Sequence, residues 1–236
     1  MKLQNVAWGI TGAGHFLNES YEVFKEIKLK NRKIRINTFV SSASEEVLRM
    51  YGLENKLVKL SGGDYLEEIF LESEQGKSSP KAGRFLLGKY DALFVTPVTS
   101  NTASKIAYGI ADSLITNAVA QAVKGGVPVY IVPVDIAGVV RSEMPYMIDR
   151  DICMKCEVCP PREKCPHDAI IDQIELLKCT GCGICKELCP YDAIKGGEVE
   201  LRVRDVDERN VQMIRGLEGI TVLEKPEHIL DLFFQD

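Results

Sequence analysis

Short apolar runs and stretches of helical periodicity alternate along the first 135 residues of the chain. The runs have the length and β-branched content of buried strands, and the stretches between them space hydrophobic residues as one face of a helix does. The serine-rich segment from Ser41 is typical of a helix start. This alternation predicts an α/β fold, a parallel sheet with helices on both faces. The predicted strands are residues 4–11, 33–40, 91–97 and 127–133, and the predicted helices are residues 16–28, 101–123 and one after Ser41.

The last part of the chain has the same character. A helix is expected to begin at residue 205, followed by a strand over 219–223 and a helix over 227–234. Because one lone strand cannot form a sheet, we expect this tail to complete the N-terminal sheet. Residues 148–197 are then an insertion before the last strand.

All eight cysteines lie in this inserted segment. The first three form C-x-x-C-x-x-C, a fourth stands alone, and the last four form C-x-x-C-x-x-C-x-x-x-C-P. This is the ligand spacing of a bacterial ferredoxin with two 4Fe–4S clusters, in which the fourth cysteine of each motif binds the other cluster. The predicted metal ligands are Cys153, Cys156, Cys159 and Cys189 for one cluster, and Cys179, Cys182, Cys185 and Cys165 for the second.

An internal repeat supports this pairing, because the pattern C-P-x-D-A-I occurs both at Cys165 and at Cys189. Five residues separate Cys159 from Cys165 where three are usual, which should alter the shape of a loop and not the number of ligands. Zinc and disulfides are the weaker alternatives. Zinc sites use paired C-x-x-C motifs without a third cysteine at the same interval, and disulfides need an oxidising compartment.

Composition narrows the possible partners. Lys and Arg total 29 against 34 Asp and Glu, a net charge of −5, which argues against binding to nucleic acid. No apolar run approaches the length of a membrane span, and the first residues do not resemble a signal peptide. Thiolates and clusters together predict a reducing, cytoplasmic location.

Three predicted strand ends carry residues suited to a phosphate. The first is the glycine-rich turn Gly9–His15, whose amides and Thr11 hydroxyl could hold a phosphate at a helix N-terminus. The second strand ends in Ser41 and Ser42 and lacks the acidic residue of a dinucleotide site, which favours a mononucleotide over NAD. These serines suit a simple helix cap equally well.

The third strand end carries a specific motif. Residues 97–102 read Pro-Val-Thr-Ser-Asn-Thr, and a helix of small residues and the triplet at 112–114, Asp-Ser-Leu, follow. Here the chain resembles the flavoprotein family of cysteine decarboxylases and flavin prenyltransferases, over most of residues 4–135. The resemblance implies bound FMN at a subunit boundary and a homo-oligomer built from trimers. By position, it implies FMN contacts at Thr11, Gly12, Ala13, Gly14, Ser41, Thr99, Ser100, Asn101 and Thr102, with Asp112 near the site.

Two departures argue against decarboxylation. Residues 81–90 lack the base histidine of the decarboxylases, and residues 133–136, Pro-Val-Asp-Ile, replace their P-x-M-N motif. Residues 76–91 and 96–102 are more similar to the branch of archaeal flavoproteins and dihydromethanopterin reductases. Forms of that branch with a fused two-cluster ferredoxin match the whole architecture.

The expected fold is thus a flavodoxin-like or Rossmann-like parallel sheet with an inserted small α+β domain of the bacterial ferredoxin type. We expect an FMN-binding domain over residues 1–147, a ferredoxin domain over 148–197, and the final strand and helix of the FMN domain over 198–236.

The resemblance implies an iron–sulfur flavoprotein oxidoreductase. Electrons from ferredoxin or another low-potential donor would pass through two 4Fe–4S clusters to FMN and on to a pterin, converting dihydromethanopterin to tetrahydromethanopterin. No catalytic residue follows from the sequence. Lys81, Arg84 and Arg141 could hold an anionic or pterin group, although a solvated charge is the commoner role. The alternative is a non-catalytic electron carrier, and flavin prenyl transfer is disfavoured because it is redox-neutral.

Overall fold

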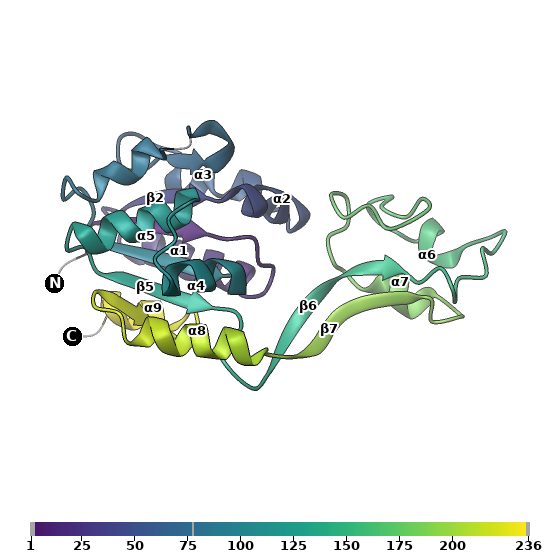
Figure 1. Cartoon of the computed structure of the whole chain (residues 1–236). Helices are drawn as coiled ribbons and strands as arrows, with labels where there is room; N and C mark the ends of the chain where they lie inside the picture. The colour runs from purple at the N-terminus through teal and green to yellow at the C-terminus, as the bar shows by residue number, and fades with distance from the viewer. Residues whose placement is uncertain (1–2, 77, 235–236) are drawn as a thin grey trace.

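The computed structural model describes residues 3–76 and 78–234, which form an α/β domain, a two-stranded arm and a small lobe (Figure 1). Three residues discussed above lie outside the described residues. Met1 and Lys2 belong to the chain start, and Lys77 belongs to the segment 76–91 that carries part of the family resemblance.

A parallel sheet of six strands forms the centre of the α/β domain, because its apolar strands are buried on both faces. All neighbouring strands run parallel. The four predicted N-terminal strands and the predicted late strand are confirmed, and the short strand β3 was not predicted. The strand order is β3 (Ile69–Leu71), β2 (Arg35–Val40), β1 (Asn5–Ile10), β4 (Ala92–Val98), β5 (Val129–Pro133) and β8 (Ile220–Val222).

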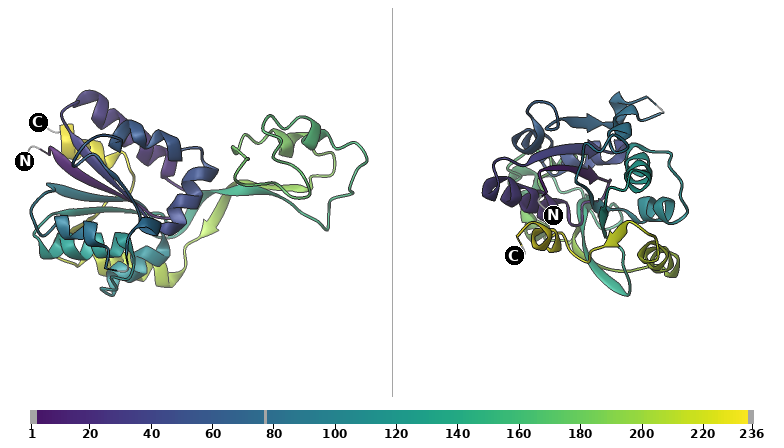
Figure 2. Two further views of the ribbon diagram at one scale, coloured as in Figure 1. Left: turned by 90° about the horizontal axis from the view of Figure 1, so that it is seen from above. Right: turned by 90° about the vertical axis from the view of Figure 1, so that its left-hand side faces the viewer.

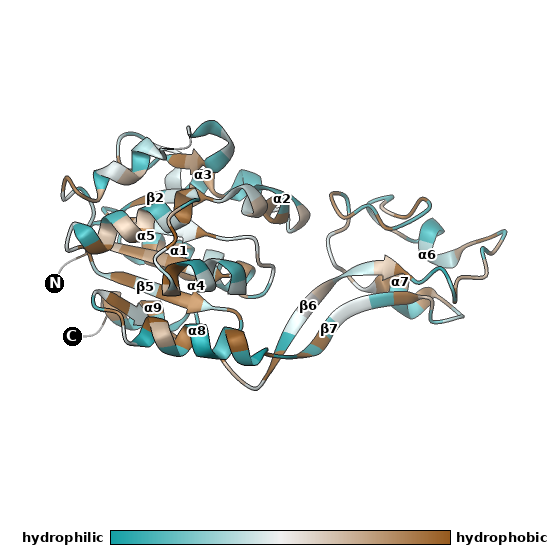
Figure 3. Ribbon diagram, in the orientation of Figure 1, coloured by the Kyte–Doolittle hydropathy of each residue, from teal (hydrophilic) through white to brown (hydrophobic). Residues whose placement is uncertain are grey.

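Helices cover both faces of this sheet, and Figure 3 shows hydrophobic residues concentrated on its strands. On one face Trp8 stacks on Phe24 of α1, with ring centroids 4.5 Å apart. On the other face Val95 packs in one cluster with Ile115 of α5 and Ile214 of α8. The helices of this domain are α1 (Leu17–Lys30), α2 (Ser42–Met50), α3 (Val58–Ser61), α4 (Ser100–Ala107), α5 (Leu114–Lys124), α8 (Asp205–Arg215) and α9 (His228–Phe234), with 3-10 turns η1 (Glu54–Lys56), η2 (Glu72–Glu74) and η3 (Pro80–Arg84).

The single helix predicted over residues 101–123 was wrong, because the structure divides it into α4 and α5. Gly109 has a φ of 69°, which ends the first helix in a left-handed turn. Ser113 then begins the second through a capping box with Thr116. Apolar periodicity alone does not reveal such a break.

The arm consists of β6 (Val139–Ile148) and β7 (Ile194–Arg202), paired antiparallel. It leaves the sheet just after the carboxyl end of β5 and holds the lobe away from the α/β domain, as Figure 2 shows from above. Neither strand was predicted. The lobe contains two short helices, α6 (Pro160–Glu163) and α7 (Ile184–Leu188), and its core gathers Ile148, Ile170, Ile174 and Ile194.

Helix α6 occupies the longer stretch between Cys159 and Cys165, so the two extra residues there are absorbed in a turn of helix. In the described parts of the chain, none of the helices combines the length and the apolar character needed to cross a lipid bilayer.

Candidate functional site

The carboxyl ends of β1 and β4 lie side by side, because these central strands pair directly. From β1 the sheet continues through β2 in one direction and through β4 in the other, which makes this the switch point where open α/β sheets bind ligands. The predicted turn after β1 and the motif after β4 therefore come together at one edge.

Thr11 joins the two strand ends. Its hydroxyl donates to the carbonyl oxygen of Pro97 at 2.8 Å and accepts from the amide of Thr99 at 2.9 Å. The side chain is only 1% exposed. A phosphate oxygen needs a donor, and the only donor of this hydroxyl is already used. The Thr11 hydroxyl is thus engaged within the protein, and it positions the two turns relative to each other.

Gly12 and Gly14 allow α2 to approach the turn closely. A Cβ atom on Gly12 would stand 2.5 Å from Cβ of Ala43, and one on Gly14 would stand 2.1 Å from the Tyr51 hydroxyl. At Gly12 the neighbours are Cβ and backbone atoms of Ala43, which cannot rotate away, whereas at Gly14 the Tyr51 side chain would have to move. Glycine is therefore required for space at position 12, and the backbone of the turn, including Ala13, stays at the edge of the sheet between β1 and α1.

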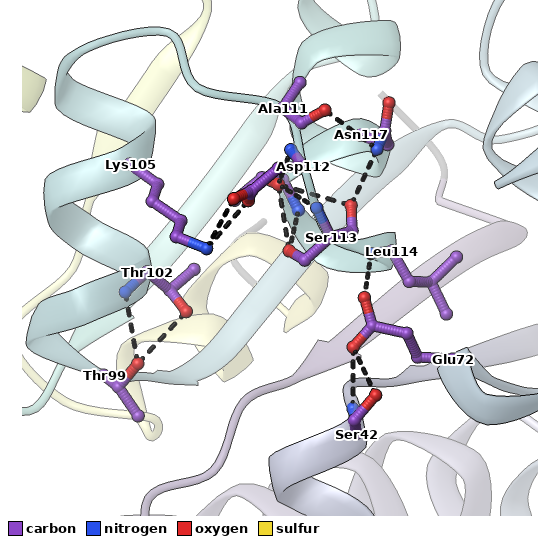
Figure 4. Close-up of polar contacts among 11 residues, drawn as sticks. Ser42, Glu72, Thr99, Thr102, Lys105, Ala111, Asp112, Ser113, Leu114 and Asn117 are labelled. Carbon is purple, nitrogen blue, oxygen red and sulfur yellow. Dashed lines mark hydrogen bonds and ion pairs between the residues drawn. The ribbon is translucent and has the colours of Figure 1, made fainter. Parts of the chain in front are cut away.

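Ser41 is the N-cap of α2. Its hydroxyl oxygen lies 3.3 Å from the Ser44 amide nitrogen and 3.1 Å from Ser44 Oγ. The next residue, Ser42, donates its amide and hydroxyl to one oxygen of Glu72, at 2.7 and 2.9 Å. The other Glu72 oxygen accepts from the Leu114 amide at 2.5 Å (Figure 4). Of the two interpretations that the sequence left open, the structure favours the helix cap, and a carboxylate already occupies the starts of α2 and α5.

The motif after β4 forms the first turn of α4. Thr99 is the N-cap and accepts from the Thr102 amide at 3.2 Å, as Figure 4 shows. The Ser100 hydroxyl donates to Asp135, one of the two residues at which the chain departs from the decarboxylase motif. Asn101 is exposed on the same turn. Asn101 is therefore the side chain of this motif that remains most accessible to a ligand.

Asp112, which the resemblance places near the site, forms an ion pair with Lys105 at 2.8 Å (Figure 4). Its side chain is 54% exposed. It stands in the loop between α4 and α5, where it lies open toward solvent in the single chain.

The three cationic candidates do not converge on this edge. Arg84 is bound to Glu68, with one nitrogen 3.1 Å from Glu68 Oε1, and this hydrogen bonding raises the pKa of Arg84 above its usual value. Lys81 lies over the ring of Phe70, 5.1 Å from its centroid. Arg141 is 73% exposed on the arm. Each of them contacts residues outside the turns that follow β1 and β4, namely Glu68, Phe70 and Glu198.

The eight cysteines divide into two groups of four around two cavities of the lobe. Each cavity is lined by the three cysteines of one C-x-x-C-x-x-C motif and by a fourth cysteine from the other half of the repeat. The internal repeat predicts this exchange of the fourth cysteine. The first cavity, of about 300 Å³, is lined by Cys153, Cys156, Cys159 and Cys189. The second, of about 20 Å³, is lined by Cys165, Cys179, Cys182 and Cys185.

The two halves of the lobe use the same local geometry. The sulfur of Cys165 accepts from the Ala169 amide at 3.3 Å, and the sulfur of Cys189 accepts from the Ala193 amide at 3.4 Å. Amide donors of this kind stabilise thiolate ligands. Ile170 lines both cavities and separates them.

The second cavity is the tighter of the two. Its volume of about 20 Å³ has room for one water. Burial raises the pKa of the Cys185 thiol, and the neighbouring Cys179 and Cys182 raise it further. All eight thiols are free. Among the described residues, no three His, Cys, Asp or Glu side chains are grouped closely enough for a single metal ion.

Comparison with known proteins agrees with this architecture. The model of the Flavoprotein family matches residues 1–143, and that of the 4Fe-4S binding domain matches residues 173–195, which contain the second cysteine motif. A dihydromethanopterin reductase (acceptor) of Methanosarcina mazei is 72% identical over 99% of this chain and 100% of its own length. Another, from Methanocaldococcus jannaschii, is 48% identical over 97% of this chain and 95% of its own length.

A solved structure has the same fold. DmrB of Burkholderia xenovorans in complex with FMN, described as a cubic protein cage for redox transfer, aligns with a TM-score of 0.62 and 25% sequence identity. The alignment covers 97% of this chain and 92% of that one.

Fold, motifs and relatives together define an iron–sulfur flavoprotein reductase. The chain belongs to the Flavoprotein family, in the group that contains the two archaeal reductases, and it is an oxidoreductase.

Proposed function

We propose that the protein reduces dihydromethanopterin to tetrahydromethanopterin. The observation that carries this is the 72% identity to a dihydromethanopterin reductase, which extends over the α/β domain, the arm and the lobe together. Two donor molecules, ferredoxin or another low-potential protein, each lose one electron. The two electrons and two protons from solvent reduce one pterin, and bound FMN supplies the hydride.

We also propose two 4Fe–4S clusters, one in each thiol-lined cavity of the lobe. The donor set fits this group, because eight free thiols are divided four and four. The swapped fourth ligand, at Cys189 for the first cluster and at Cys165 for the second, is the pattern that two-cluster ferredoxins require.

For FMN, we propose contacts from the backbone of Gly12, Ala13 and Gly14 and from Asn101 and Thr102. The hydroxyl bridge of Thr11 supports this, because it brings the two turns to one edge of the sheet at a switch point. The remaining residues that the resemblance suggests, Ser41, Thr99 and Ser100, would act through backbone groups, since their hydroxyls are engaged in caps or with Asp135.

We further propose a homo-oligomer built from trimers, with FMN at the boundary between copies. The cage described for the DmrB structure supports an assembly of this kind. In the loop between α4 and α5, Tyr108 and Ile110 are 58% and 48% exposed and are available for a contact between copies.

A cytoplasmic location is also proposed, because free thiols favour a reducing compartment. The domain limits proposed are 1–147, 148–197 and 198–236, and the arm spans both junctions of the lobe.

The test is anaerobic reduction by reduced ferredoxin, followed optically, with dihydromethanopterin added afterwards. We expect the reduced flavin to be reoxidised as one pterin is reduced per flavin. A reduced flavin that ignores this pterin for many minutes, yet reduces a second redox protein, would instead establish the non-catalytic electron carrier.

A further inference from the structure

The α/β domain and the lobe face each other across a cleft of about 310 Å³. On the side of the α/β domain it is lined by Asn18, Met50 and Tyr51, at the start of α1 and the end of α2. On the opposite side it is lined by Tyr146 of the arm and by Cys179 and Thr180 of the lobe. We call this space the interdomain cleft.

Only one of the two cysteine groups reaches the interdomain cleft. Tyr146, Cys179 and Thr180 line both the cleft and the second cavity. None of the residues that line the first cavity also lines the cleft. Tyr146 is also close to the second motif, because a Cβ on Gly183 would stand 3.0 Å from its hydroxyl.

The opposite wall of the cleft reaches the proposed FMN site. Tyr51 follows the last residue of α2, and its hydroxyl lies against Gly14, where a Cβ would stand 2.1 Å away. Gly14 belongs to the turn between β1 and α1, at the edge of the sheet where the proposed FMN contacts gather. The cleft therefore lies between the second cysteine group and the flavin turn of the same chain.

The first cavity does not open into the interdomain cleft, because the two share no lining residue. Ile170 lines both cavities, and the second cavity shares three lining residues with the interdomain cleft where the first shares none. Exposed Arg150 and Lys155 line the first cavity. These cations suit the approach of an acidic donor protein.

We propose that the two clusters act in a defined order, an inference that rests on the FMN and cluster sites of the proposed function. The cluster held by Cys153, Cys156, Cys159 and Cys189 accepts each electron from the donor. The cluster held by Cys165, Cys179, Cys182 and Cys185 is the immediate electron partner of the flavin. With both clusters and FMN bound, each donor would be oxidised by one electron, which would pass from the Cys153 group to the Cys165 group and on to the flavin. Two such passages, with two protons from solvent, would supply the two-electron reduction of FMN.

The first test uses a matched pair of ligand variants, Cys182→Ser and Cys156→Ser, each at the middle cysteine of its motif. The fluorescence lifetime of bound, oxidised FMN is measured in each holoprotein, with iron per chain determined in parallel. An iron–sulfur cluster quenches flavin fluorescence steeply with distance. We expect a several-fold longer lifetime in Cys182→Ser and a lifetime close to that of the unaltered protein in Cys156→Ser. Equal lengthening in the two variants, or the reverse order, would overturn the proposal.

A second pair of variants leaves all eight cysteine ligands in place. It tests which cluster receives electrons from the donor, even if a ligand variant loses both clusters. Arg150→Glu reverses a charge at the first cavity, and Lys178→Glu reverses one beside the second motif. We expect Arg150→Glu to slow the reduction by reduced bacterial-type ferredoxin about tenfold at low salt, and Lys178→Glu to leave it unchanged. If only Lys178→Glu slowed the reduction, the donor would act at the cluster of the second motif, and the proposed order would be overturned. Neither test uses a pterin, so failure here is distinguishable from failure of the proposed reaction.

Discussion

The hydroxyl of Thr11 donates to the carbonyl oxygen of Pro97 at 2.8 Å and so ties the end of β1 to the end of β4. The hydroxyl oxygen of Thr11 also accepts from the amide of Thr99, the N-cap residue of α4. One buried hydroxyl therefore sets the relative position of the two turns at which FMN is proposed to bind.

Replacing Thr11 with Val should loosen both turns. The change leaves the half-buried amide of Thr99 without its partner and leaves the Pro97 carbonyl with only the Thr11 backbone amide, at 3.3 Å. Losing these bonds costs about 1–3 kcal/mol of the free energy of unfolding. We expect weaker FMN binding as well, measured by fluorescence titration of the apoprotein. Thr11→Ser keeps the hydroxyl and is the matched control. An unchanged FMN affinity in Thr11→Val would contradict the positioning role.

Gly12→Ala should be destabilising by about 1–3 kcal/mol, because the new methyl group would meet Ala43 of α2 at 2.5 Å. The backbone of α2 lies behind that contact, so the clash cannot be relieved by rotating a side chain. Unfolding in urea measures the effect. Gly83→Ala is the control, since nothing lies within 4 Å of its Cβ position.

A second substitution tests whether the contact with Ala43 is the cause. Ala43→Gly makes room for the methyl group, so the double variant Gly12→Ala with Ala43→Gly should recover part of the loss. Additive effects of the two changes in a double-mutant cycle would show that the strain arises elsewhere.

The Glu68–Arg84 pair should make stability depend on pH. The side chains are 29% and 14% exposed, and the hydrogen bond from Arg84 lowers the pKa of Glu68. A carboxyl group whose pKa is lower in the folded state stabilises the fold above its unfolded pKa, about 4.3. That contribution is lost as the pH falls through the folded value.

Glu68→Gln should therefore cost about 2 kcal/mol at pH 7 and less at pH 3. Denaturant unfolding at both pH values measures this. Glu46→Gln, at an exposed position of α2, is the control. A cost for Glu68→Gln that is equally large at both pH values would mean that the carboxylate charge is not the stabilising group.

Ile170→Ala should weaken the lobe without affecting the sheet. Ile170 is 4% exposed in the core of the lobe and lines both thiol cavities, so truncation costs about 2–5 kcal/mol locally. We expect faster loss of iron to a chelator and unchanged FMN binding. Leu177→Ala, at a side chain 61% exposed, should retain iron normally. Equal iron loss in the two variants would argue against Ile170 as a structural partition.

Local rules account for much of what could be predicted. Hydrophobic residues recur along the chain with a period of two in strands and 3.6 in helices. Strands such as β1 and β4 could therefore be located from their own residues. The short strand β3 and the arm strands β6 and β7 were missed, because an exposed or very short strand carries little apolar signal. The break between α4 and α5 was missed because Gly109 interrupts a pattern that otherwise continues.

Some features of the candidate site could likewise be predicted from the sequence, and others depend on contacts between distant segments. Cysteine spacing predicted which four thiols could share a cluster, since ligand geometry restricts how far apart they lie along the chain. The role of Thr11 could not be predicted, because its partners Pro97 and Thr99 are far away in sequence and meet it only through strand pairing. The same is true of Glu72, whose contacts with Ser42 and Leu114 depend on how two helices meet.

The sequence by itself determined the alternation of strands and helices, the two cysteine motifs and the resemblance to a flavin-binding family. These features depend on spacing along the chain. Tertiary structure alone decided the strand order, the two-stranded arm and the cleft between Tyr51 and Cys179. Proximity between distant segments arises from the packing of the whole fold, and that packing brings Cys179 of the second cysteine group to the same cleft as Tyr51.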